Sequence, residues 1–370
     1  MTHTKVAILG AGLAGLNAAR LLHRAGIDFI LLEARGRPGG RILSVDAAGA
    51  PAADGFDLGP SWFWPDRQRA IAALVRELGL ESFPQNAQGD VVFERMSREA
   101  PHRLSGLRDD QQSQRIVGGS AALVDALVKA LPTDRLRYGA KVVAMTMTAG
   151  GVALSVRTRD TVDETLTAEQ VMVALPPRLL AATIPLDPAP DDGVLHLWNS
   201  TPTWMAPHAK VFALYDRPYW REAGFSGTAQ SLVGPMAEIH DATTHSGQAA
   251  LFGFVGVGAG QRAAIGEEAL KAACIQQFAR IFGDEAAHPR AVLLKDWASD
   301  PLTATPADAA PTAHAAGQAQ DWITGPWQTR LAFAGSETSA IEAGFLSGAV
   351  EASVEAAKVV QHRLKGGLSG

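Results

Sequence analysis

A glycine-rich turn near the start of the chain restricts the possible fold more than any other feature. Its sequence is Gly10-Ala11-Gly12-Leu13-Ala14-Gly15. The apolar stretch 5–9 before it predicts a buried parallel strand, and apolar residues at helical spacing after it predict a helix. In such a turn Gly10 permits the tight bend, Gly12 lets a pyrophosphate approach the backbone, and Gly15 lets helix and strand pack closely. The segment therefore predicts the first strand–helix unit of a doubly wound, Rossmann-like α/β domain that binds a dinucleotide.

The residues after the next strand make this site more specific. The apolar stretch 28–32 predicts a second strand and ends on Glu33, where an acid can accept a hydrogen bond from a ribose hydroxyl. The turn that follows is Ala34-Arg35-Gly36-Arg37-Pro38-Gly39-Gly40-Arg41. Backbone N–H groups of the glycine pair and an arginine side chain can bind the same phosphate. The alternative interpretation of this segment is a basic surface turn.

A third glycine-containing segment lies near the end of the chain. Residues 331–338, which include Gly335, predict a short buried strand and a polar turn, and residues 343–351 predict the start of a final helix. A helix that begins near Gly344 would point its positive end at a flavin pyrimidine, where reduction places negative charge. Glu337 would then meet the ribityl chain or the ribose. The apolar face of the helix is predicted to contain Val350, Val354 and Val359. The three segments together predict FAD rather than another dinucleotide.

Charge and composition disfavour several classes of function. The 370 residues carry a formal charge of -5 and contain no Lys/Arg block of the kind that follows phosphates, so nucleic acid is not expected as a partner. No apolar run reaches the roughly 18 residues of a membrane span, and the first strand begins too early for a signal peptide, so we expect a soluble, cytoplasmic protein. The single cysteine, Cys274, lies in a helical apolar run and is expected in the core. No metal site is expected, because four histidines match no metal motif by their spacing: His208, His240, His245 and His314.

The chain is predicted to form two domains. The FAD-binding domain is assigned to residues 1–82, 113–190 and 318–362. The substrate domain, of α+β type and built on a mixed sheet, is assigned to residues 83–112 and 191–317. The expected elements are a hairpin with its turn at Gly150-Gly151, strands at 210–215 and 249–257, a helix at 267–282 and a loop over 301–320.

These segments resemble, almost from end to end, the flavin-containing amine oxidase family, which includes monoamine and polyamine oxidases and the histone-demethylating members. Further matches are Asp57-Leu58-Gly59-Pro60-Ser61-Trp62, Lys141-Val142-Val143, Ala209-Lys210-Val211 and Trp297. The resemblance implies FAD, bound noncovalently, because Pro306 stands where some members carry the cysteine that attaches the flavin. The fingerprints and the resemblance together assign to the cofactor site Gly10, Ala11, Gly12, Gly15, Glu33, Ala34, Arg35, Gly39, Gly40, Arg41, Gly59, Pro60, Ser61, Trp62, Val142, Gly335, Glu337, Gly344 and Phe345.

The residues expected to take part in catalysis are Lys210, Phe345, Trp62 and Trp297. Lys210 interrupts an otherwise apolar strand, where a charge is costly unless it has a partner. The alternative is a lysine that extends from an edge strand to solvent. In the family, the matching lysine lies near flavin N5 through a water and assists flavin oxidation or proton handling. Two aromatic walls commonly frame the substrate nitrogen; Phe345 matches one, and Ala307 stands at the expected place of the other.

The resemblance implies that a small-molecule amine is oxidised at its C–N bond to an imine by hydride transfer to flavin N5. Oxygen then restores the flavin and forms hydrogen peroxide. Two alternatives stay open: a FAD-dependent desaturase or oxidase of a non-amine substrate, and a redox-inactive flavin-binding partner protein. A homodimer is compatible with the sequence. The segment 81–117 is shorter than the helical cap of most members, so we expect a more open substrate side.

Overall fold

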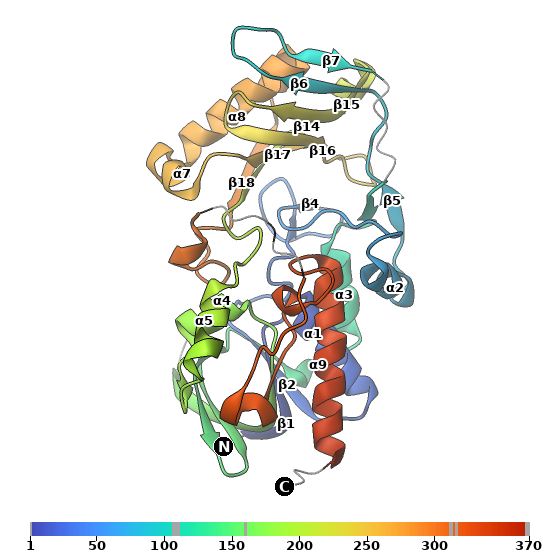
Figure 1. Cartoon of the computed structure of the whole chain (residues 1–370). Coiled ribbons are helices and arrows are strands. Elements are labelled where there is room, and N and C mark those ends of the chain that lie inside the picture. Colours follow the sequence, from blue (N-terminus) through green and yellow to red (C-terminus); the bar gives the residue numbers. More distant parts are fainter. Residues whose placement is uncertain (1, 106–111, 159–160, 311–313, 315–316, 367–370) are drawn as a thin grey trace.

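The structure is a computed structural model that describes residues 2–105, 112–158, 161–310, 314 and 317–366. Two large sheets lie toward opposite ends of the view in Figure 1. The first sheet occupies the lower part with the long final helix, and the second occupies the upper part. Both chain ends lie at the lower end of the view.

The first sheet has a parallel centre. Five strands neighbour one another through parallel pairing, in the order β19 (Leu331–Phe333), β12 (Thr161–Val173), β1 (Thr2–Leu9), β2 (Phe29–Glu33) and β9 (Leu136–Tyr138). Along β1, Val6 and Ile8 enter one hydrophobic cluster while Ala7 and Leu9 enter another. A parallel sheet that is covered on both faces is the arrangement of a doubly wound domain, so the predicted fold class is confirmed.

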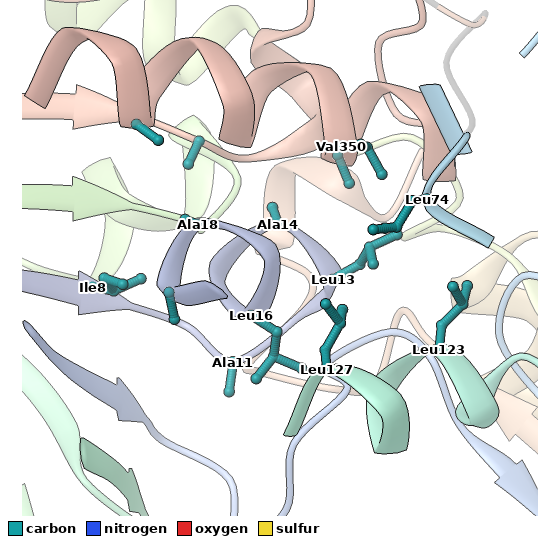
Figure 2. Close-up of a cluster of buried hydrophobic side chains, with 14 of the residues drawn as sticks. Ile8, Ala11, Leu13, Ala14, Leu16, Ala18, Leu74, Leu123, Leu127 and Val350 are labelled. Carbon is teal, nitrogen blue, oxygen red and sulfur yellow. The ribbon is translucent and has the colours of Figure 1, made fainter. Parts of the chain in front are cut away.

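Helices cover one face of this sheet. They are α1 (Leu13–Arg24), α2 (Arg69–Glu77), α3 (Ala121–Lys129) and α9 (Leu346–Gly366). Figure 2 shows how the apolar side chains of these helices meet, with Leu13 and Leu16 of α1 beside Leu74 of α2 and Leu127 of α3. Removing this apolar surface from water stabilises the domain by about 25 cal/mol for each Å² buried.

The final helix differs from its predicted form. It begins at Leu346, two residues after Gly344. Its buried side contains Val350, Ala356 and Val360, whereas the predicted face also included Val359, which is 41% exposed. The small residues of α9 explain the error, because buried alanines and Ser353 allow close packing on α1 without appearing as an apolar stripe.

Two short helices and further strands of the same eight-stranded sheet pack in the hydrophobic cluster on the opposite face. These are β10 (Lys141–Thr148), β11 (Gly151–Thr158), β13 (Leu186–Asp187), α4 (Pro177–Thr183) and α5 (Asp192–Ser200). The hairpin between β10 and β11 turns at the expected glycines, and β11 pairs antiparallel with the first part of β12. Trp198 and Trp327 fill the core between these elements and the sheet.

The second sheet is mixed, with the strand order β18-β14-β17-β16-β15-β6-β7. Its strands are β6 (Asp90–Glu94), β7 (His102–Leu104), β14 (Ala209–Tyr215), β15 (Phe225–Ser231), β16 (Met236–Asp241), β17 (Ala249–Val255) and β18 (Ala291–Asp296). Its helices are α6 (Tyr219–Glu222), α7 (Ala259–Ile265) and α8 (Glu267–Phe282). The strands predicted at 210–215 and 249–257 and the helix predicted at 267–282 are confirmed, and Cys274 of α8 is buried against the sheet.

Two small antiparallel pairs connect the domains. They are β3 (Ser44–Val45) with β4 (Phe56–Asp57), and β5 (Ser82–Pro84) with β8 (Gln114–Ile116). The segment 81–117 forms β5 to β8, and its residues 106–111 lie outside the described part of the chain. In the described part it adds strands to the edge of the second sheet. No helix among the described residues is long and apolar enough to cross a membrane.

Candidate active site

A cavity of about 620 Å³ extends from the ends of the parallel strands to the second sheet. Residues that directly follow β1, β2 and β12 line it, namely Gly10, Ala34 and Ala174. The carboxyl ends of parallel strands are where open α/β sheets bind ligands. The structure brings most of the predicted site residues to this wall: Gly10, Gly12, Glu33, Ala34, Arg35, Gly39, Gly40, Arg41, Gly59, Pro60, Ser61, Trp62, Val142, Lys210, Trp297, Gly335, Gly344 and Phe345. Ala11, Gly15 and Glu337 do not line it.

Each glycine of the first turn is needed for a different physical reason. Gly10 has φ +98°, and a Cβ atom on Gly15 would lie 1.9 Å from the carbonyl oxygen of Gly10, so the protein itself requires both. Gly12 has φ -71°, and a Cβ atom there would lie 4.0 Å from the nearest protein atom, the oxygen of Gly39. Space is therefore left open at the start of α1, where no side chain of the described residues caps the helix. A phosphate fits both the space and the free N–H groups.

Glu33 faces the cavity in a polar setting. Its carboxylate accepts hydrogen bonds from the backbone N–H groups of Ala11 and Arg35, each at 2.7 Å. These bonds fix the carboxylate and leave lone pairs for a hydroxyl group. Glu337 behaves differently, because its buried Oε1 lies 2.8 Å from Nη1 of the half-buried Arg41 in an ion pair. The structure thus shows Glu337 beside the lining residue Arg41 rather than in the cavity wall.

Lys210 lies in the interior of the second sheet. Its strand, β14, pairs with both β18 and β17, so the edge-strand alternative is wrong. Lys210 is 5% exposed to solvent. Its ammonium donates hydrogen bonds to Gly59 O (2.5 Å), Ser61 Oγ (3.0 Å) and Asp57 O (3.3 Å). Burial lowers the pKa of Lys210 to about 7, Asp57 acts to raise it, and Arg115 acts to lower it further.

The wall beyond Lys210 contains residues that the sequence did not identify. Lys210, Phe254 and Glu238 lie opposite one another on β14, β17 and β16, so their side chains share one face of the sheet. All three line the cavity. His240, whose Nε2 lies 3.6 Å from a carboxylate oxygen of Glu238, lowers the pKa of Glu238. His208 also lines the cavity, and burial and Arg262 lower its pKa.

Of the two positions expected to frame the substrate nitrogen, Phe345 lies at the cavity and Ala307 does not. Phe345 lines the cavity, but its ring contacts Trp204 edge to face at 4.6 Å, which leaves no gap for an amine between these two rings. Trp204 also lines the cavity and was not predicted. Pro306 and Ala307 do not line the cavity. From the segment after Trp297, residues 301–303 line it instead. A short capped turn diverts the chain there, with Asp308 bound by Thr305 and by Arg178.

Trp62 and Trp297 are fixed by their indole N–H groups. Trp62 Nε1 donates to Gln85 Oε1 at 2.9 Å, and Trp297 Nε1 donates to Leu58 O at 3.0 Å. Both rings line the cavity on the side of the second sheet. Among the residues that the structure describes, no group of three or more His, Cys, Asp or Glu side chains is placed to hold a metal ion.

Comparisons with known proteins give a consistent result. The family "Flavin containing amine oxidoreductase" matches residues 13–111 and 99–361. A Dictyostelium discoideum protein, whose name assigns it to the flavin-containing monoamine oxidases, is 23% identical over 458 aligned positions that cover 97% of this chain and 98% of that protein. Because this chain has only 370 residues, that relative contains insertions that this chain lacks.

Solved structures show the same fold. Putrescine oxidase bound to putrescine has a TM-score of 0.78 at 22% identity, with 97% of this chain and 99% of that chain covered. Cyclohexylamine oxidase from Brevibacterium oxydans has a TM-score of 0.81 at 21% identity, with 98% and 99% covered. The match to the family extends over most of the sequence, and the cavity brings its three glycine segments together. The chain belongs to the flavin-containing amine oxidoreductases and is a flavin-dependent oxidoreductase.

Proposed function

We propose that the protein uses noncovalently bound FAD to oxidise the C–N bond of an amine to an imine, with oxygen as the electron acceptor. The observation that carries this proposal is one continuous cavity, lined by the glycine segments of the first domain and by Lys210 of the second. When bound, the flavin supplies a hydride acceptor at N5 and passes electrons to oxygen, which forms hydrogen peroxide.

The residues of the protein provide position and proton handling in this proposal. The turn at Gly12 and the N–H groups at the start of α1 bind the pyrophosphate. The carboxylate of Glu33 accepts a hydrogen bond from a ribose hydroxyl. Lys210 has a pKa of about 7, so Nζ can hold or release a proton near neutral pH. Trp62 and Trp297 exclude water from the substrate side.

The position of the cysteine supports noncovalent binding. The chain has one cysteine, Cys274, and it is buried under the second sheet, where burial raises the pKa of its thiol to about 12. It does not line the cavity. Precipitation of the protein with acid should therefore release all flavin into the supernatant, and flavin that stays with the precipitate would refute this part of the proposal.

Glu238 favours substrates with a second positive charge. Its carboxylate lies at the cavity wall, two strands from Lys210, and neighbouring strands are about 4.8 Å apart. The backbones of the two residues are therefore about 10 Å apart. An extended amine with its reacting carbon near Lys210 could place a distal ammonium at Glu238. The side chain of Glu238 is 56% exposed, which indicates an open end of the cavity.

The test is product analysis under air. Purified holoprotein is incubated with primary, secondary and diamine substrates. Water hydrolyses the imine product to an aldehyde and releases the amine nitrogen, and the aldehyde and peroxide are measured with and without catalase. Equal amounts of aldehyde and peroxide from at least one amine support the proposal. Turnover of a non-amine in place of every amine would indicate the desaturase or non-amine oxidase, and a flavin that no substrate reduces would indicate the redox-inactive protein.

A further inference from the structure

An ion pair joins the two domains at the wall of the cavity. Arg35, which follows β2, donates from Nη1 to both carboxylate oxygens of Asp300, each at 3.0 Å, and from Nη2 to Thr303 Oγ1 at 2.9 Å. Asp300 and Thr303 belong to the segment that follows β18 of the second sheet. The side chains of Arg35 and Asp300 are 14% and 8% exposed, so salt screens their attraction only weakly. The contact therefore fastens a segment of the second domain to the first.

The segment that begins at Asp300 is a compact turn beside the cavity. The backbone carbonyl of Asp300 accepts hydrogen bonds from the N–H groups of Thr303 and Ala304, each at 2.9 Å. Its Oδ1 accepts from the N–H of Leu302 at 3.0 Å. Residues 301–303 line the cavity, whereas Asp300 does not. Asp300 thus holds the turn together and also connects it to the first domain.

The three arginines of the glycine-containing turn after β2 have different partners. Arg37 donates to three backbone carbonyls nearby in the sequence and does not line the cavity. Arg41 lines the cavity, and its side chain is 30% exposed although it pairs with Glu337. Arg35 also lines the cavity, but both of its Nη atoms donate to the second domain. Arg41 is thus placed to meet a phosphate, whereas Arg35 connects the two walls.

The ion pair lies next to the predicted ribose site. The backbone N–H of Arg35 donates to Oε1 of Glu33 at 2.7 Å, and Glu33 and residues 301–303 line the same cavity. Moving the turn away from Arg35 would separate two charges that are largely out of water, which is costly. The ion pair therefore resists opening of this end of the cavity.

We propose that Asp300 is a positioning residue that retains the flavin nucleotide. Through Arg35 it keeps the turn 300–304 on the cofactor domain and slows the dissociation of FAD. Asp300 does not line the cavity, so it acts on the cofactor through Arg35 and through the turn. The inference rests on the noncovalent binding of FAD proposed above and adds the contact that limits its release.

The test measures how fast flavin leaves the protein. Holoprotein freed of excess FAD is diluted, and the flavin absorbance that stays with the protein after rapid gel filtration is followed over time. Asp300→Asn should release FAD at least about tenfold faster than the native protein, because losing one partner of a buried charge pair acts on the dissociation rate. Arg35→Gln should do the same and should fold, because Lys295 Nζ still lies 3.1 Å from Asp300 Oδ2. Glu164→Gln is the control, since it removes an exposed ion pair with Arg137 away from the cavity lining and should release FAD at the native rate.

A double variant separates this role from direct binding of the cofactor by Arg35. If Arg35 acts through Asp300, the pair is already lost in each single variant. Arg35→Gln combined with Asp300→Asn should then release FAD at a rate within about threefold of the faster single variant. If Arg35 binds the nucleotide itself, the two effects multiply. Multiplied effects, or native release in Asp300→Asn, would overturn the proposal.

Thr303→Val decides the case in which Asp300→Asn does not fold. It removes the acceptor of Arg35 Nη2 but keeps both charges and nearly the same side-chain shape. It should speed release by about threefold or more, the effect of one lost hydrogen bond to a charged group. The same substitution should have no further effect in Arg35→Gln. A native release rate in Thr303→Val, or an equal effect in both backgrounds, contradicts the proposal.

Failure of the proposed function gives a different result, because release is measured without substrate. Protein that oxidises no amine but releases FAD faster in the variants contradicts the proposed function and supports the inference. Amine oxidation together with equal release rates in all variants contradicts the inference alone. Flavin that stays with the acid-precipitated native protein contradicts both.

Discussion

The two sides of the cavity are built by different means. On the first domain, glycines that lie close together in the sequence expose backbone groups, as at Gly10 and Gly12 and at Gly39-Gly40. On the second domain, the wall is made of side chains that are far apart in the sequence, such as Lys210, Glu238 and Phe254. The cofactor side is thus defined by local sequence, and the substrate side by strand register. Substitutions on the two sides should accordingly affect different measurements.

The largest effect is expected at Gly12. Gly12→Val should fold but bind no flavin and give colourless protein, because a Cβ atom there meets no protein atom closer than 4.0 Å and the side chain would fill the space of the pyrophosphate. Gly15→Val provides the contrast, since a Cβ atom there overlaps the carbonyl oxygen of Gly10, and the protein should fail to fold. Flavin absorbance and circular dichroism measure both results. Yellow Gly12→Val protein would remove the basis for placing the pyrophosphate at this turn.

The next largest effect is expected at Lys210. Lys210→Met should keep the flavin and slow its reductive or oxidative half-reaction by about ten- to a thousandfold, the range for a positioned proton-handling group. The remaining rate should lose any pH dependence near pH 7, where the native lysine titrates. Stopped-flow absorbance measures each half-reaction. If both half-reactions of the variant proceed at native rates, Lys210 is a structural residue that binds the loop at Gly59 and Ser61.

Folding stability offers an independent check on the same residue. The pKa of Lys210 is lowered from 10.5 to about 7 in the folded state, so the unfolded chain binds more protons between these pH values. Lys210 therefore destabilises the fold most at pH 7 and below, and this cost decreases as the pH rises toward 10.5. The stability advantage of Lys210→Met should be largest at the acidic end of this range and shrink above it. An advantage that is constant with pH in denaturant titrations would indicate that Lys210 does not titrate in this way.

The smallest effect is expected at Glu238 and concerns specificity alone. Glu238→Gln should lower kcat/KM for a diamine by about fivefold and leave the monoamine of equal length unchanged, because a half-exposed ion pair contributes about 1 kcal/mol. Flavin content should not change. Equal losses for diamine and monoamine would show that Glu238 does not select a second charge.

How much of the site could be predicted from the sequence also differs between the two sides of the cavity. The parallel core, the glycine segments and Lys210 could be predicted because spacing and local chemistry encode them. Glu238, His208 and Trp204 could not, because their approach to the cavity depends on cross-strand pairing and on the course of irregular segments. Ala307 was misplaced for a related reason: the capped turn at Thr305 and Asp308 changes the direction of the chain, and simple counting from Trp297 does not detect it.

Anaerobic reduction of the bound flavin tests the central claim most directly. Oxidised holoprotein is mixed without oxygen with a panel of primary, secondary and polyamines, and the flavin absorbance is followed, with dithionite as the positive control. We predict that at least one amine bleaches the flavin, that extended amines with a second charge do so most efficiently, and that oxygen restores the absorbance. A flavin that dithionite reduces but no amine bleaches would contradict amine oxidation by this protein.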